Sequence, residues 1–262
     1  MTVLTINKLT PTVGAEVLGV DPDRLTSDET LAAAVLDALE DNGVLVFPGL
    51  HLNPEAQVAF CRRLGQVDHS SDGHHPVAGI YPITLDKSKN ASADYLRATF
   101  DWHIDGCTPV GDECPQRATV LSAIQVAERG GEKEFANSYA AYDAFSDEEK
   151  ERFAGLRVVH SLEASQSRIT PGPTAEQLAR WRSRPTHEHP LVWTHRSGRK
   201  SLVLGASAHY VVGINRDEGQ ELLADLLDRA TRPELIYSHR WSVGDTVIWD
   251  NNGVLHRAAP YD

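Results

Sequence analysis

A histidine and an aspartate stand two residues apart in FDWHIDGCTP, at positions 100–109, and this spacing can serve metal binding. Side chains at i and i+2 of an extended segment point to the same face, so an extended ATFDWHID stretch would present His103 and Asp105 together. WDNNGVLHRAAPYD, near the other end, supplies a third candidate ligand, His256. Two histidines and one carboxylate leave coordination positions open, an arrangement typical of non-haem Fe(II) oxygenases.

The same residue types allow two other interpretations. A His-x-Asp pair can simply be the polar face of a surface strand. Zinc also accepts His and Asp ligands and activates water, so the histidine-rich DHSSDGHHP at 68–76, together with His103 and Asp105, would make a zinc-dependent hydrolase. The ligand pair alone does not decide among these alternatives.

Composition narrows the class of protein. The chain has 262 residues, a formal net charge of −12 and 41% hydrophobic residues, which predicts one globular domain over residues 1–262. The negative charge argues against nucleic acid as a partner, although local basic groups can still bind a small anion. No apolar run is long enough to predict a membrane span, and no secretory signal begins the sequence, so we expect a cytoplasmic protein. Cys61, Cys107 and Cys114 predict free thiols.

Local signals predict helices on both sides of the candidate ligands. Residues 26–43 read as a helix capped by Ser27 and ended by Gly43, and residues 53–65 repeat the pattern with an Asn53 cap. A capping box at 146–149 and an amphipathic stripe over 215–231 predict two more.

Short β-type runs lie between the helices and do not alternate with them one for one. They are 44–49, 117–126, 189–195, 200–205, 234–241 and 245–251. The pattern predicts a mainly β protein, a sheet pair or barrel with helices packed outside. Residues 69–100 are rich in turn formers and predict a long loop, of the kind that often acts as a lid.

Four separated segments, in this order, resemble the taurine dioxygenase and TfdA family of Fe(II)- and 2-oxoglutarate-dependent dioxygenases. They are HID at 103–105, GGEKEFANSYAAYDAFS at 130–146, HPLVWTHRSGRKSLVLG at 189–205 and WSVGDTVIWDNNGVLHRA at 241–258. VGAEVLGVD, VLVFPG and RRLGQVD near the start are similar to that family too, so the resemblance spans nearly the whole chain. It implies a double-stranded β-helix (jelly-roll) core with flanking helices, and Fe(II), 2-oxoglutarate and O2 as cofactors.

The resemblance also assigns residues. His103, Asp105 and His256 match the family's iron ligands. Leu121 and Trp249 match positions near the cosubstrate or iron pocket, although a tryptophan in VIWDN also suits plain core packing.

The sequence departs from the family at two places. Lys133 stands in GGEK where the family has a threonine that contacts 2-oxoglutarate; its ammonium can meet a carboxylate, or it can be an exposed, solvated loop lysine. The family also places an arginine shortly beyond the distal histidine, and no residue up to Asp262, the last of this sequence, stands at the matching spacing. A buried carboxylate without a basic partner is costly in free energy. We therefore expect the natural protein to continue past Asp262 and to supply that arginine there.

The implied substrate is a small organic anion, such as a sulfonate like taurine, a sulfate ester or an aryloxyalkanoate, hydroxylated with release of succinate and CO2. Arg168 is the preferred anion-binding residue, although it can equally be a surface arginine. His74 or His75 matches a substrate-binding loop histidine, and Thr99 is a weaker pocket candidate. Because of Lys133 and the unmatched arginine, the sequence does not exclude a jelly-roll binding protein without catalytic activity. It does not exclude a homo-oligomer either.

Overall fold

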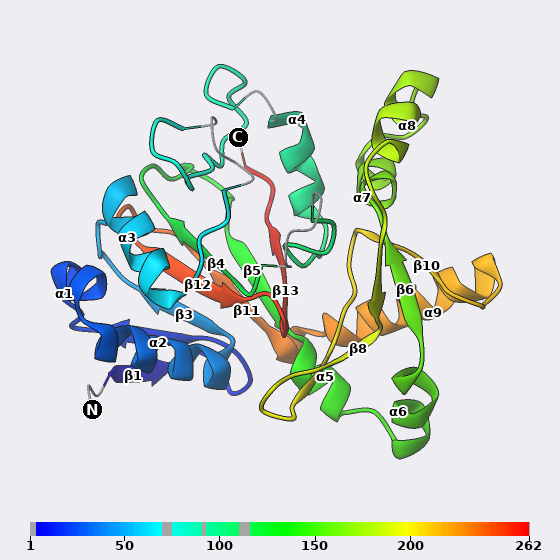
Figure 1. Cartoon of the computed structure of the whole chain (residues 1–262), viewed down its shortest axis with the longest axis horizontal. Helices are drawn as coiled ribbons and strands as arrows, with labels where there is room; N and C mark the ends of the chain where they lie inside the picture. The colour runs from blue at the N-terminus through cyan, green and yellow to red at the C-terminus, as the bar shows by residue number, and fades with distance from the viewer. Residues whose placement is uncertain (1–3, 70–74, 91–92, 110–115, 262) are drawn as a thin grey trace.

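The computed structural model describes residues 4–69, 75–90, 93–109 and 116–261 (Figure 1). One sheet has the strand order β1-β2-β3-β12-β4, and its pairs are antiparallel except for β2 with β3. Its strands are β1 (Thr5–Lys8), β2 (Ala15–Leu18), β3 (Val44–Phe47), β12 (Thr246–Asp250) and β4 (Ala118–Ser122). A second, antiparallel sheet has the order β11-β5-β13, from β11 (Ile236–His239), β5 (Lys133–Asn137) and β13 (Val254–Ala258).

These two sheets face each other across a buried core. The Phe135 ring of β5 and the Trp249 ring of β12 lie 5.5 Å apart between centroids, and both side chains are almost completely buried. The same cluster contains Val13, Val44, Val46, Val247 and Val254. Alternating inward side chains from facing sheets build the predicted sheet-pair core, and β13 brings its own residues to one edge of it.

Helices cover the outer face of the first sheet (Figure 1), as predicted. They are α1 (Pro22–Ser27), α2 (Glu29–Asn42) and α3 (Pro54–Leu64). The predicted Asn53 cap of α3 is confirmed. The predicted Ser27 cap of α2 is wrong: Asp28 accepts hydrogen bonds from the Thr30 and Leu31 backbone, while Ser27 ends α1 and bonds back to the Asp23 carbonyl.

A second group of elements packs around another hydrophobic cluster. Its strands form the sheets β10-β6-β7 and β8-β9, from β6 (Arg157–His160), β7 (His187–Pro190), β8 (Val192–Thr194), β9 (Lys200–Leu202) and β10 (Ala208–Val211). Helices α5 (Ser138–Asp143), α6 (Asp147–Ala154) and α9 (Arg216–Ala230) contribute to this cluster. Helices α7 (Leu162–Ile169) and α8 (Ala175–Arg182) pack against each other, and α7 also packs against β10. The short 3-10 helix η2 (Pro233–Leu235) leads from α9 to β11.

Two predictions from this half of the chain are confirmed. The capping box of Ser146 and Glu149 opens α6, and α9 buries Leu223 and Leu226 of its leucine stripe. Strands β5, β6, β10 and β13 were not among the predicted runs.

The predicted loop at 69–100 is only partly a loop. Residues 75–90 contain neither helix nor strand, but α4 (Ala93–Leu96) and the 3-10 helix η1 (Arg97–Phe100) end the segment. ATFDWHID is therefore not extended throughout, which corrects the strand expected there.

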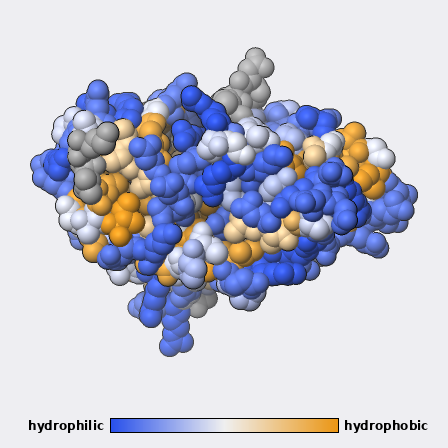
Figure 2. All heavy atoms as spheres, turned by 90° about the horizontal axis from the view of Figure 1, so that it is seen from below, coloured by the Kyte–Doolittle hydropathy of each residue, from blue (hydrophilic) through white to orange (hydrophobic). Residues whose placement is uncertain are grey.

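The surface is mixed. Figure 2 shows a mostly hydrophilic face on which hydrophobic side chains gather in separate areas. In the described part of the chain, no helix is both long and apolar enough to cross a membrane. Cys61 and Cys107 are free thiols, as predicted, whereas Cys114 lies outside the described residues.

Candidate metal centre

Backbone pairing brings the two candidate histidines together from distant parts of the sequence. The His103 amide donates to the His256 carbonyl at 3.0 Å, and the His256 amide donates to the His103 carbonyl at 2.9 Å. His256 lies in the middle of β13, opposite Phe135 of β5. This bridge places the histidines side by side without the continuous strand that the sequence suggested.

The side chains of His103, Asp105 and His256 converge on one point. The Asp105 carboxylate lies 3.7 Å from His103 Nε2 and 3.4 Å from His256 Nε2. Within the described residues, this is the one group of His, Cys, Asp or Glu side chains whose ligand atoms all lie within 4.8 Å of one another. The histidine-rich segment at 68–76 contributes no described residue to it, which removes the specific basis for the zinc hydrolase.

The histidine nitrogens are arranged as metal ligands need them. The Nδ1–H of His103 donates to the Asp101 carbonyl at 2.8 Å, which leaves the Nε2 lone pair directed at the cluster. The His256 ring is completely buried, and neither of its nitrogens has a hydrogen-bond partner in the part of the chain that the structure describes. A buried imidazole without a partner is costly, and a bound cation would satisfy it. These residues fit a divalent metal.

The electrostatics favour the metal-binding protonation states. Burial, followed by the neighbouring His256 charge, lowers the pKa of His103 to about 3, and burial also lowers the pKa of His256. Burial opposes ionisation of Asp105, but the charges of His256 and His103 hold the pKa of its carboxyl well below the usual range. Neutral imidazoles and an ionised carboxylate all offer lone pairs to a cation at neutral pH.

A hydrogen-bond chain orients the carboxylate. Thr119 of β4 donates its hydroxyl proton to Asp105 at 2.8 Å, and the Asn251 amide donates to the Thr119 hydroxyl at 2.9 Å. Thr119 lies opposite Trp249 in the β4–β12 register. The sequence reading missed Thr119, although it lies two residues before the expected pocket residue Leu121 on the same strand, and hence on the same face.

Lys133 begins β5 and is half-buried, so it is not an exposed loop lysine. Its Nζ lies 4.7 Å from the centre of the Trp249 ring. Burial lowers the pKa of its ammonium to about 8, and the negative charge of Asp105 opposes this shift. The same Trp249 ring lies 4.9 Å from the His256 ring between centroids, so the ammonium places a positive charge close to the ligand cluster.

The sequence suggests two roles for Trp249, core packing and a wall of the iron or cosubstrate pocket, and its surroundings suit both. Its side chain is 2% exposed within the core, and its ring lies 4.9 Å from that of His256 between centroids. Leu121 is half-buried in β4, opposite Val247. Both residues come from the sheet that faces β13.

The residues predicted to bind substrate do not converge on one point as the three candidate metal ligands do. Arg168 is exposed in the last turn of α7. Thr99 lies in η1 and donates its hydroxyl proton to the Leu96 carbonyl at 2.6 Å. His75 accepts a hydrogen bond from the Val77 amide at 3.0 Å, and His74 lies outside the described residues. None of the three described residues belongs to the ligand cluster.

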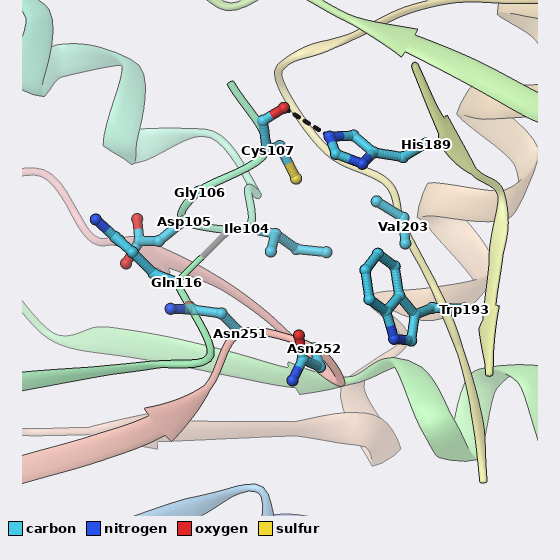
Figure 3. Close-up of a pocket in the computed structure, with 10 residues that line it drawn as sticks. All are labelled: Ile104, Asp105, Gly106, Cys107, Gln116, His189, Trp193, Val203, Asn251 and Asn252. Atoms are coloured by element: carbon cyan, nitrogen blue, oxygen red, sulfur yellow. Dashed lines mark hydrogen bonds between the residues drawn. The ribbon is translucent and has the colours of Figure 1, made fainter. Parts of the chain in front are cut away.

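A small cavity of about 30 Å³ lies beside Asp105, and Figure 3 shows it between Gly106, Cys107 and Asn251 on one side and His189 and Trp193 on the other. It has room for roughly one water molecule. The His189 Nε2–H donates to the Cys107 carbonyl at 2.8 Å, and this hydrogen bond links the segment that follows Asp105 to β7.

Comparisons with known proteins agree with this site. A profile described as "Taurine catabolism dioxygenase TauD, TfdA family" matches residues 5–262. The chain is 36% identical over 270 residues to the alpha-ketoglutarate-dependent 2,4-dichlorophenoxyacetate dioxygenase of Cupriavidus pinatubonensis, covering 98% of this chain and 92% of the relative. It is 35% identical over 263 residues to an (S)-phenoxypropionate/alpha-ketoglutarate-dioxygenase of Sphingobium herbicidovorans, covering 98% of this chain and 90% of that relative.

A solved structure, AAD-2 in complex with Mn(II) and N-oxalylglycine, superposes with a TM-score of 0.83 at 30% identity and covers 99% of this chain and 92% of that chain. These matches confirm the predicted fold class, enzyme class and cofactors, and they favour a dioxygenase over a zinc hydrolase or a silent binding protein. With a family profile over residues 5–262 and a triad of the expected ligand types, the chain belongs to the TauD/TfdA family of dioxygenases.

Proposed function

We propose that this protein hydroxylates a small organic anion with Fe(II), 2-oxoglutarate and O2, and releases succinate and CO2. The observation that carries the proposal is the convergence of two imidazoles and one carboxylate, with lone pairs free, at the edge of the sheet-pair core. Relatives are named for 2,4-dichlorophenoxyacetate, (S)-phenoxypropionate and sulfate esters, which are all organic anions. We further propose that the enzyme acts in the cytoplasm, without nucleic acid or membrane partners, and place no limit on its oligomeric state.

Each group at the site has a defined part in this reaction. His103, Asp105 and His256 would hold the iron, and Thr119 keeps the Asp105 carboxylate turned toward it. Bound Fe(II) and 2-oxoglutarate supply the oxidising chemistry when present. The chain's own contribution is to position the substrate C–H bond and to keep water from the site, which the buried Trp249 and His256 rings favour.

A substrate screen tests this function. Purified enzyme supplied with Fe(II) and 2-oxoglutarate is expected to release succinate faster when an aryloxyalkanoate, an alkyl sulfate or a sulfonate is added. At least one anion should raise the rate above that of the uncoupled reaction, as measured by succinate quantification. Stimulation by neutral or cationic compounds alone would contradict the anion assignment, and succinate release without dependence on Fe(II) would contradict the dioxygenase itself.

Lys133 is our proposed partner for the far carboxylate of 2-oxoglutarate, next to the walls formed by Leu121 and Trp249. Its support is a half-buried ammonium that lies 4.7 Å from the centre of the Trp249 ring and has no ion-pair partner within 4.0 Å among the described residues. A partly desolvated ammonium beside a metal site gains a strong charge-assisted contact when a carboxylate arrives.

Lys133→Met is expected to weaken binding of N-oxalylglycine, an inert 2-oxoglutarate analogue, by about tenfold or more, because a charge-assisted contact is lost. Calorimetry on the Mn(II)-loaded protein measures this without turnover. Mn(II) affinity should stay within about threefold, since the ligands remain. Lys200→Met is the matched control, because Lys200 also lies over an aromatic ring, that of Tyr142 at 5.8 Å, outside the ligand cluster. Equal analogue affinity in the Lys133→Met and Lys200→Met variants would exclude the assignment.

A further inference from the structure

A second cavity, of about 310 Å³, lies between the segment that follows the metal ligands and the helices α4, α7 and α8. Tyr95 of α4, Leu162 of α7 and Arg180 of α8 line it, together with Thr108 and Pro109. The remaining lining residues, Arg184 and Pro185, follow the end of α8. Figure 1 shows α4 standing across from α7 and α8. The cavity is large enough for a small organic molecule.

The cavity is positively charged although the chain as a whole is strongly negative. Arg180 and Arg184 are its charged lining residues, and among the described residues no carboxylate lines it. Neither guanidinium has an ion-pair partner within 4.0 Å in the described part of the chain. Arg182 behaves differently, because both Glu163 carboxylate oxygens accept its hydrogen bonds at 2.7 and 3.0 Å. Among the described residues, the guanidiniums of Arg180 and Arg184 thus line the cavity without an ion-pair partner, whereas that of Arg182 is paired.

The other lining residues suit an apolar body. The guanidinium of Arg180 lies 5.4 Å from the centre of the Tyr95 ring, and Leu162, Pro109 and Pro185 add aliphatic surface. An arginine held over an aromatic ring keeps its donors at the ring edge and can meet an anion there. The lining fits a ligand with an aromatic or aliphatic part and an anionic end.

The cavity is also close to the metal centre along the chain. Thr108 follows Asp105 by three residues, so their Cα atoms are at most roughly 11 Å apart even if that stretch is fully extended. In addition, η1 packs against both α7 and β13, the strand that carries His256. A ligand in this cavity therefore lies next to the segment that presents two of the three metal ligands.

We propose that Arg180 and Arg184 bind the anionic group of the substrate, and that the apolar body of the substrate lies against Tyr95, Leu162 and Pro109. This inference rests on the proposed function and gives it a substrate class, an anion attached to an apolar body. It also moves the anion-binding role from Arg168 to Arg180 and Arg184: all three residues are exposed, but only the latter two line this cavity.

The test measures binding, not turnover. Protein loaded with Mn(II) and N-oxalylglycine is titrated calorimetrically with 2,4-dichlorophenoxyacetate and, separately, with the neutral alcohol 2-(2,4-dichlorophenoxy)ethanol. The unmodified protein should bind the acid at least about tenfold more tightly than the alcohol, because the acid gains a charge-assisted contact. Arg180→Gln and Arg184→Gln should each weaken binding of the acid by about tenfold and leave binding of the alcohol within about threefold. Arg168→Gln is the matched control and should bind both compounds as the unmodified protein does.

The possible outcomes distinguish a failure of this inference from a failure of the proposed function on which it rests. The inference is overturned if the Arg180→Gln and Arg184→Gln variants bind the acid as tightly as the unmodified protein, if Arg168→Gln alone loses affinity, or if the unmodified protein binds neither compound. Loss of affinity for acid and alcohol alike, with thermal unfolding unchanged, would also overturn it, because the charge would then not be what is recognised. Absence of Fe(II)-dependent succinate release instead contradicts the proposed function, and the titration still reports on the two arginines.

Discussion

Asp105→Ala is expected to abolish Fe(II)-dependent succinate release and to lower Mn(II) affinity by more than about 100-fold. The variant loses the anionic ligand outright, whereas disturbing a residue that merely orients a ligand already costs about 10–100-fold. Asp105 has 28% of its side chain exposed, so its loss leaves little buried volume empty. Equilibrium dialysis with Mn(II), together with succinate quantification at matched iron, measures both effects.

Asp101→Ala is the control for this variant. It removes a carboxylate from the same segment, but only the Asp101 backbone carbonyl contacts His103. The control should keep its metal affinity, and full activity of the Asp105→Ala variant would exclude the triad. His256→Ala is a poorer test, because that ring is completely buried and its removal would also open a cavity in the core.

Gly205→Ala is expected to cost about 2–5 kcal/mol of the free energy of unfolding, and to displace His103 from its place in the site. Gly205 has a φ of 109°. A Cβ there would lie 2.7 Å from the Trp102 carbonyl oxygen and 2.8 Å from the His103 Cα. Both are backbone atoms of the ligand segment, which cannot turn aside as a side chain could. Urea unfolding and Mn(II) titration of the purified variant measure the two effects.

Gly198→Ala separates backbone strain from collision. Gly198 also has a positive φ, of 84°, but nothing lies within 4 Å of a Cβ added there. This control should lose only about 1–2 kcal/mol, the ordinary cost of a left-handed conformation for a residue with a side chain, and should bind Mn(II) normally. If both variants lost the same free energy of unfolding, the close approach of Gly205 to His103 would contribute nothing to the cost of the Gly205→Ala substitution.

The sequence predicted features whose signals are local. The Asn53 cap and the Ser146–Glu149 capping box each lie within one helical turn, so the residues themselves carry the information. The Ser27 prediction failed at the same scale, because two helices meet there and Asp28, one residue on, serves both as the end of α1 and as the cap of α2. Strand β13 was missed because its pairing depends on β5, far away in the sequence.

The candidate site divides in the same way. The ligand types of His103, Asp105 and His256 are visible in the sequence, and the structure brings them together. The role of Thr119 depends on where β4 lies beside Asp105, which no local pattern encodes. Arg180 and Arg184 face a cavity only because α8 stands opposite α4, so the sequence pointed to Arg168 instead.

The reciprocal backbone pairing of His103 and His256 would give a metal bound at this site a part in folding as well as in chemistry. These residues come from opposite halves of the chain, so an ion held between them would close the segment from β4 to β13 into one loop, as a covalent cross-link would. An ion bound only by the native state stabilises it by about 2.7 kcal/mol when present at 100 times its dissociation constant. A cell short of iron would then lose not only the activity of this enzyme but part of its resistance to unfolding and proteolysis.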